Sequence, residues 1–133
     1  MLKNGVNLSN QRTFIAVPDS VIYTRDITAT EKILLAVMSL NKVPVSTEEK
    51  ESKYVCTLTQ KVLMELAGIN SSRTITTAIN SLEAYGAIKI IQIKDSRGRK
   101  LGNIYQLANY ENGFKAIEEL TDKELDFCIN IRE

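Results

Sequence analysis

Apolar residues recur at helical spacing over residues 29–41, where intervals of three and four separate them. Thr28 and Glu31 precede this run and match a capping box, in which a hydroxyl and a carboxylate accept hydrogen bonds from free backbone N–H groups. The pattern predicts a helix over residues 29–41. Upstream, the apolar run at residues 14–17 ends at Pro18 and predicts a short extended segment.

Two further helices are predicted, and a glycine-containing turn joins them. The first covers residues 60–67 and ends at Gly68, a residue type that tolerates left-handed backbone angles. Asn70 or Ser71 caps the second helix, because both side chains accept hydrogen bonds from backbone N–H groups. The apolar residues of this second helix lie four and three apart, and Gly86 marks its end.

A pattern of two strands follows the second of these helices. Residues 87–94 and 103–108 are β-prone, and the segment between them, residues 95–102, is basic and rich in glycine. A shorter strand is predicted at residues 54–58. The order predicts an α+β fold, a winged helix-turn-helix with a three-helix core and a β-hairpin wing.

Two segments lie outside this predicted core. Residues 41–53 are polar, charged and contain Pro44, so we expect an exposed loop. Helical spacing in residues 110–120 and a second capping pattern at Thr121 and Glu124 predict C-terminal helices. We therefore divide the chain into a winged helix-turn-helix domain at residues 14–109 and a helical extension at residues 110–133. The extension is expected to pack on the domain or to form a dimer contact.

Composition narrows the classes of function. The chain has 133 residues, 44% of them hydrophobic and 25% charged, which is typical of a globular domain. It contains no histidine, and its two cysteines, Cys56 and Cys128, match no metal-site spacing and are expected to be buried free thiols. With no phosphate-binding loop either, we expect no enzyme, no cofactor and no metal. No signal peptide or membrane span is recognisable, so a cytoplasmic location is expected.

Charge is distributed unevenly, although the net charge is only +1. Residues 54–110 carry a net charge of +4, whereas residues 111–133 carry −4. A basic middle beside an acidic end indicates that the middle part binds an anionic partner.

The candidate partner is double-stranded DNA, because a helix fits the major groove and its outer side chains reach base edges and phosphates. A hydroxyl-rich helix face or a basic turn is by itself more typical of a solvated surface; together, on these elements, they favour DNA. Arg97 and Arg99 are the first candidates in the wing. The full set of candidate DNA contacts is Gln60, Lys61, Asn70, Ser71, Ser72, Arg73, Thr74, Thr76, Thr77, Asn80, Lys94, Arg97, Arg99 and Lys100.

The stretch LTQKVLMELAGINSSRTITTAINSLEAYGAIKI, residues 58–90, resembles a known family. It is similar to winged helix-turn-helix domains at the N-termini of plasmid and phage replication initiators and replisome organisers of Gram-positive bacteria. The resemblance covers residues 14–108 and implies a sequence-specific DNA-binding protein of a mobile element. Such a protein acts as an accessory factor in replication or conjugative transfer, or as a transcriptional regulator, and often pairs as a homodimer. The alternative is a module that docks onto a replication or transfer protein.

Overall fold

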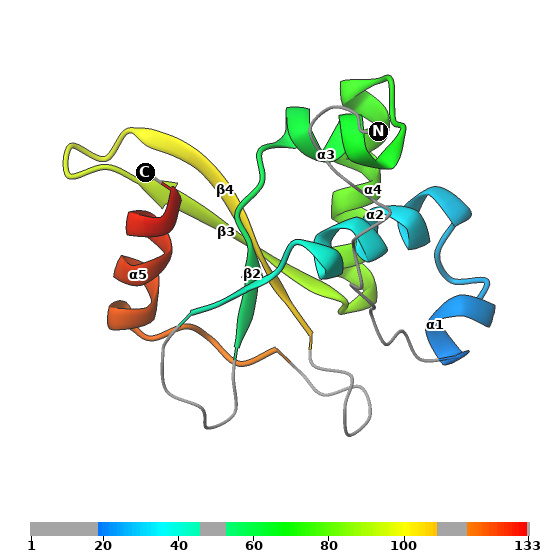
Figure 1. The fold of residues 1–133 in the computed structure, drawn as a ribbon, viewed down its shortest axis with the longest axis horizontal. Coiled ribbons are helices and arrows are strands. Elements are labelled where there is room, and N and C mark those ends of the chain that lie inside the picture. Colours follow the sequence, from blue (N-terminus) through cyan, green and yellow to red (C-terminus); the bar gives the residue numbers. More distant parts are fainter. Residues whose placement is uncertain (1–18, 46–52, 109–116, 133) are drawn as a thin grey trace, which may run out of the picture.

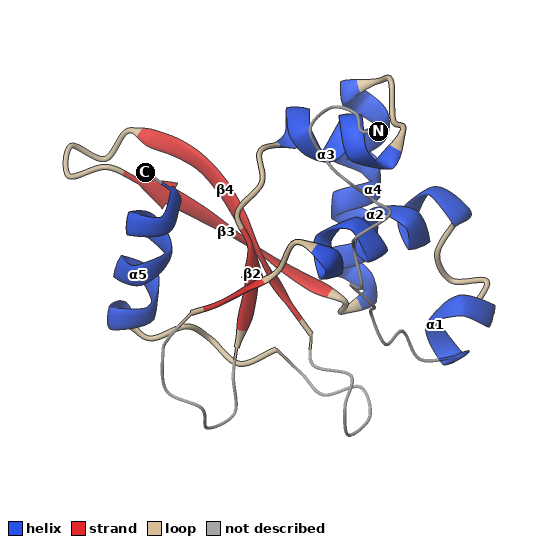
Figure 2. Cartoon of the chain, in the orientation of Figure 1, coloured by secondary structure: helices blue, strands red, loops and turns tan. Residues whose placement is uncertain are grey.

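The computed structural model describes residues 19–45, 53–108 and 117–132, which form a mixed α+β fold (Figure 1). The described part contains five helices and a four-stranded antiparallel sheet, coloured by type in Figure 2. In chain order the elements are α1 (Asp19–Tyr23), α2 (Ala29–Leu40), β1 (Val43–Pro44), β2 (Tyr54–Cys56), α3 (Gln60–Ala67), α4 (Ser72–Tyr85), β3 (Ile88–Lys94), β4 (Lys100–Leu107) and α5 (Asp122–Arg132). Helix α1 was not predicted, and the segment predicted at residues 14–17 lies outside the described residues.

The predicted helix starts and stops are confirmed for the helices before the hairpin. At the start of α2, the Glu31 N–H donates to the Thr28 hydroxyl at 3.2 Å, and the Thr28 N–H donates to the Glu31 carboxylate at 3.0 Å. Gly68 and Gly86 end α3 and α4 with φ angles of 72° and 94°. These left-handed angles favour glycine, and they allow each chain reversal to follow its helix directly.

The sheet has the strand order β1-β2-β4-β3, with β3 and β4 forming a long hairpin. Pairing runs from Ile88 opposite Leu107 to Lys94 opposite Lys100, with a register shift between Ile93 and Lys94. The predicted turn at residues 95–102 was too long, because β4 already begins at Lys100. The shift absorbs an extra residue and lets the strands pair almost to the tip.

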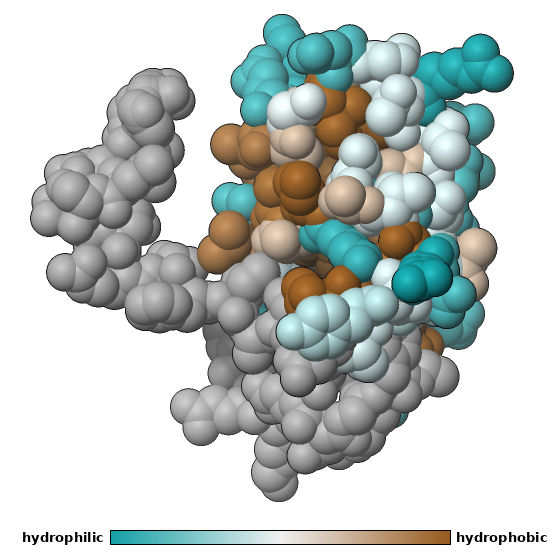
Figure 3. Space-filling view, turned by 90° about the vertical axis from the view of Figure 1, so that its right-hand side faces the viewer, coloured by the Kyte–Doolittle hydropathy of each residue, from teal (hydrophilic) through white to brown (hydrophobic). Residues whose placement is uncertain are grey.

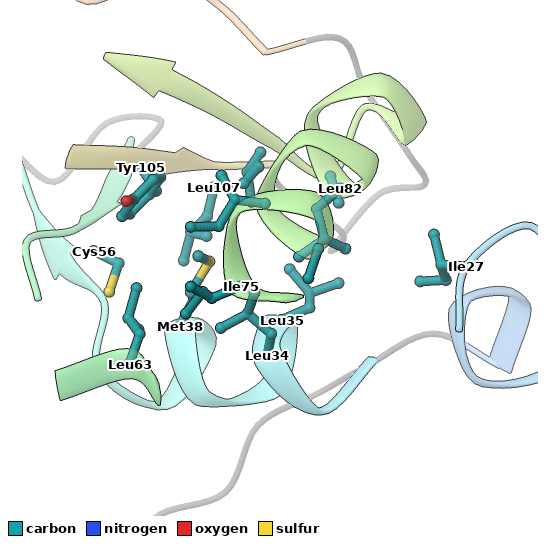
Figure 4. Close-up of a cluster of buried hydrophobic side chains, with 14 of the residues drawn as sticks. Ile27, Leu34, Leu35, Met38, Cys56, Leu63, Ile75, Leu82, Tyr105 and Leu107 are labelled. Atoms are coloured by element: carbon teal, nitrogen blue, oxygen red, sulfur yellow. The ribbon is translucent and has the colours of Figure 1, made fainter. Parts of the chain in front are cut away.

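One face of the sheet packs against the helices and forms the main core (Figure 4). Successive strand side chains point to opposite faces, so Ile88, Tyr105 and Leu107 reach the helical side. They meet α2 through Leu35 and α4 through Ile75, both essentially inaccessible to solvent. This packing determines which side of α4 faces outward.

The opposite face of the same sheet carries a second, smaller core under α5. Its buried members are Val45, Val55, Ile93, Ile104 and Cys128. The prediction that residues 41–53 form an exposed loop was wrong at residues 43–45. Strand β1 pairs with β2 there, and Val45 is 2% exposed. Proline fits this position because β1 is an edge strand with one side unpaired.

Helix α5 begins at the predicted capping pattern. The Glu124 N–H donates to the Thr121 hydroxyl at 3.2 Å, and the Thr121 N–H donates to the Glu124 carboxylate at 2.8 Å. Lys53 lies 3.0 Å from the same carboxylate. Burial opposes the charged form, but the bonds from Thr121 and Lys53 outweigh it and hold the pKa of Glu124 below its usual value. Residues 117–121 are not helical, in contrast to the prediction for 110–120, whose first seven residues lie outside the described part.

Both cysteines are buried and neither forms a disulfide, as predicted. Cys56 belongs to the main core and Cys128 to the core under α5. Burial, together with the nearby Glu124 carboxylate, raises the pKa of the Cys128 thiol to about 11. A thiol with this pKa stays protonated near neutral pH, which suits an apolar packing role.

Candidate nucleic-acid interface

Helix α4 has one fully buried side and one fully exposed side. Its buried residues are Ile75, Ala78, Ile79 and Leu82, which match the predicted apolar stripe. The predicted contacts at its start and along its outer side are all exposed: Asn70, Ser71, Ser72, Arg73, Thr74, Thr76, Thr77 and Asn80. The helix therefore presents one uninterrupted polar side to solvent.

The structure assigns local roles to two hydroxyls of this side. Ser71, rather than Asn70, caps α4, since its hydroxyl accepts a hydrogen bond of 3.3 Å from the Thr74 N–H. The Thr76 hydroxyl donates to the Ser72 carbonyl oxygen at 2.8 Å. The hydrogen of the Thr76 hydroxyl is therefore used within the helix, and the contact of Thr76 with a ligand stays a prediction.

The first three turns of α4 carry no acidic residue. Glu83 is the acidic residue of α4, and it lies in the last turn, far from Arg73 in the first. Its carboxylate accepts a hydrogen bond of 2.8 Å from the Ile90 N–H, which holds it against β3. A polyanion that approaches the first three turns of α4 therefore meets Arg73 and no carboxylate of this helix.

Asp95 organises the tip of the β3–β4 hairpin. One carboxylate oxygen accepts hydrogen bonds from the N–H groups of Arg97 and Arg99, at 2.8 and 2.9 Å. The other oxygen lies 2.8 Å from the Arg99 guanidinium Nε. The Arg99 N–H is the main cause that keeps the pKa of Asp95 below its usual value; its guanidinium and the Arg97 N–H add to this effect. Gly98 closes the turn with a φ angle of 80°.

Sequence reasoning missed this role of Asp95, which it counted only as an acid in a basic region. The signal that indicates it is an aspartate two residues before an Arg-Gly-Arg turn, a position where its side chain accepts N–H groups further along the chain. The tip is therefore a preformed turn that holds its cations in place.

The four wing cations differ in how much of their charge is available. Arg99 is paired with Asp95, so its charge is partly offset. Lys94, Arg97 and Lys100 are exposed, and the described residues provide no ion-pair partner for them. The sequence ranked Arg97 and Arg99 equally. The ion pair with Asp95 distinguishes them, because the charge of Arg97 is not offset by a carboxylate among the described residues.

Gln60 and Lys61 are exposed at the start of α3, immediately after the Thr59 cap. In Figure 1 the start of α3 and the α3–α4 turn lie at the upper right, and the tip of the β3–β4 hairpin lies at the left-hand extreme of the molecule. All three predicted groups of contacts are on the upper side in this view, but the hairpin tip is separated from α3 and α4 by β2 and the body of the hairpin.

Within residues 19–45, 53–108 and 117–132, no group of three or more cysteine, aspartate or glutamate side chains is placed to hold a metal ion. In the same described ranges no helix has both the length and the apolar character that crossing a bilayer requires. Comparisons with protein-family models, with curated proteins and with solved structures gave no significant match.

Proposed function

We propose that this chain is a winged helix-turn-helix protein that binds double-stranded DNA sequence-specifically. In this proposal α3 and α4 are the helix-turn-helix, with α4 in the major groove, and the β3–β4 hairpin is the wing on the backbone or in the minor groove. Following the sequence resemblance, its role is that of an accessory factor in replication or conjugative transfer, or of a transcriptional regulator, in a plasmid or phage. It is not an enzyme.

The observation that carries the proposal is the presence of two surfaces suited to an anionic partner, the outer side of α4 and the wing tip. The exposed side of α4 offers hydrogen-bonding groups and Arg73 without a nearby acid. The wing tip adds three cations that have no ion-pair partner among the described residues. Cations placed for phosphates and short polar groups placed for base edges are the two requirements of sequence-specific binding.

A salt titration of duplex binding tests the proposal directly. Selection from a random duplex pool provides a preferred site, and fluorescence anisotropy then measures the affinity for this site and for a scrambled duplex. With about four to six phosphate contacts, the logarithm of the association constant should fall with a slope of roughly −4 to −5 against the logarithm of salt concentration. A protein that binds no duplex even at low salt, or whose affinity does not respond to salt, contradicts the proposal.

We further propose that two copies of the chain associate through an apolar band on the helices. Figure 3 shows brown side chains gathered on the side of the molecule that carries the helices. Residues 33–40 of α2 include no charged residue, although several of them face solvent. The large exposed apolar side chains of α1, α2 and α3 are Ile22, Tyr23, Ile33, Leu40 and Leu66.

The neutrality of this band favours a second copy over a charged partner. Contiguous exposed apolar patches rimmed by polar residues often mark association sites. A standard interface buries about 800 Å² on each partner, somewhat over half of it apolar. By contrast, Cys128 and Ile129 of α5 pack in the core beneath it. The alternative is that a replication or transfer protein covers this band. The experiment below distinguishes this alternative from a dimer.

Glutamate at Ile33 or Leu40 is expected to abolish dimerisation, because each places a charge in the apolar band. These side chains are 52% and 45% exposed, so the substitutions leave the core intact. Sedimentation velocity over a range of concentrations measures the dimer. Leu101→Glu is the matched control, since Leu101 is 40% exposed but lies at the wing. A monomer at all concentrations, or a dimer insensitive to both α2 substitutions, contradicts this interface.

A further inference from the structure

One stripe of α4 faces away from the core and carries an arginine, two threonines and an asparagine in that order. Arg73, Thr76, Thr77 and Asn80 follow at intervals of three, one and three residues, so they line one face of the helix, and all four are exposed. Over seven residues the stripe is about 10 Å long, at 1.5 Å per residue. This length corresponds to about three base-pair steps of B-DNA at 3.4 Å each.

In the middle of this stripe, Thr76 presents its methyl group rather than its hydroxyl. The Thr76 hydroxyl is turned back along the helix, where it donates to the Ser72 carbonyl oxygen at 2.8 Å. The γ-methyl is then the group that this exposed side chain offers to a ligand. Among the four base pairs, only those that contain thymine place a methyl group in the major groove, and threonine methyls are partners for it.

The residues at the two ends of the stripe, Arg73 and Asn80, are instead suited to hydrogen-bond with the polar edges of bases. The Arg73 guanidinium matches the two acceptors of guanine, and the Asn80 amide matches the donor and acceptor of adenine. Threonines in the middle are short, so the helix backbone can approach the floor of the groove until the methyl groups touch. The acidic residue of α4, Glu83, lies beyond Asn80 at the end of the stripe, where its carboxylate accepts a hydrogen bond from the Ile90 N–H.

From this arrangement we infer that α4 recognises A·T pairs through their thymine methyl groups, beside a single G·C pair that Arg73 contacts. The inference rests on the proposed DNA-binding function and names the class of sequence that this function selects. The wing agrees with it, because runs of A·T pairs have a narrow minor groove that attracts arginine, and Arg97 is the wing arginine without an ion-pair partner among the described residues.

Replacing thymine by deoxyuridine in the selected site tests the inference. The replacement removes only the 5-methyl group and keeps every hydrogen-bonding group of both grooves. Each buried methyl contributes about fourfold in affinity. Two contacted thymines should therefore weaken binding about tenfold or more in the substituted duplex.

Two substitutions of Thr76 separate its methyl group from its hydroxyl. Thr76→Ser removes the methyl and keeps the hydroxyl, so it should weaken binding to the thymine duplex and reduce the difference between the two duplexes. Thr76→Val keeps a methyl and removes the hydroxyl, so it should preserve that difference. Thr74→Ser is the control, because Thr74 is exposed on α4 but lies beside the stripe.

The outcomes separate this inference from the proposed function. Equal affinity for the thymine and deoxyuridine duplexes, with binding still weakened by salt, overturns the thymine contact and leaves DNA binding intact. A thymine preference that Thr76→Val abolishes and Thr76→Ser preserves also overturns it, since the hydroxyl is then the contact. Absence of binding to any duplex overturns both.

Discussion

Ile75→Ala is expected to lower the free energy of unfolding by about 2–5 kcal/mol, the cost of truncating a fully buried isoleucine in a packed core. Ile75 is completely inaccessible to solvent in α4 and belongs to the core between helices and sheet. Its loss leaves a cavity between α4 and α2. Chemical denaturation followed by circular dichroism measures the change as a lower midpoint with an unchanged slope.

The neighbouring position provides the control for this substitution. Thr76 is exposed one residue further along α4, and Thr76→Ala should change the free energy of unfolding by no more than about 0.5 kcal/mol. The comparison tests the rotation of α4 about its axis. If Ile75→Ala costs no more than Thr76→Ala, the outward side of α4 is assigned wrongly, and with it the proposed DNA-contacting stripe.

Removing two wing cations together, with Arg97→Ala and Lys100→Ala, is expected to weaken binding to every duplex by about 10- to 100-fold at low salt. Both side chains are exposed and have no ion-pair partner among the described residues. The slope of log affinity against log salt should become shallower by about 2, one for each lost phosphate contact. Selected and scrambled duplexes should be affected alike.

Arg25→Ala with Lys123→Ala is the matched control for the wing variant. It removes the same total charge from exposed positions before α2 and in α5, away from the hairpin tip. This control should leave the salt slope unchanged. Equal losses in both double variants would mean that total charge, rather than the wing, determines affinity, and would contradict a positioned wing contact.

Arg99→Ala alone should weaken binding less than Arg97→Ala, although both residues lie in one short turn. The difference comes from Asp95, whose carboxylate bonds to the Arg99 guanidinium and offsets its charge. The sequence shows three cations close to Gly98, namely Arg97, Arg99 and Lys100, but does not show which of them forms an ion pair with Asp95. That choice depends on the turn conformation, in which Asp95 accepts both backbone N–H groups.

The helices could be predicted closely because their signals are local. A cap acts on residues two or three positions further along, and a terminal glycine acts through its own backbone angle. Helix α3 therefore coincides with its predicted residues 60–67, and the bounds of α2 and α4 differ little from their predictions. The outward side of α4 follows from the same local spacing, since the apolar residues at 75, 79 and 82 determine which side is buried.

The sheet could be predicted only in part, because strand pairing joins residues far apart in the chain. Val43 pairs with Val55, and β2 pairs with β4 across the whole helix-turn-helix segment. The loop prediction for residues 41–53 used only the proline and the charges within that segment. It could not take into account strand partners that lie elsewhere in the chain. Val45 is buried only because α5, more than seventy residues later, covers that face of the sheet.

The sequence by itself determined helices α2, α3 and α4, the apolar side of α4 and the residues that form the candidate DNA-contacting surface, since these depend on spacing within a few turns. Only the tertiary structure decided how this surface is built. It places the wing tip at the far end of the long β3–β4 hairpin, pairs Arg99 with Asp95 and commits the Thr76 hydroxyl to the Ser72 carbonyl. These outcomes depend on turn geometry, strand register and rotamer choice, which arise when the two faces of the sheet are packed at once.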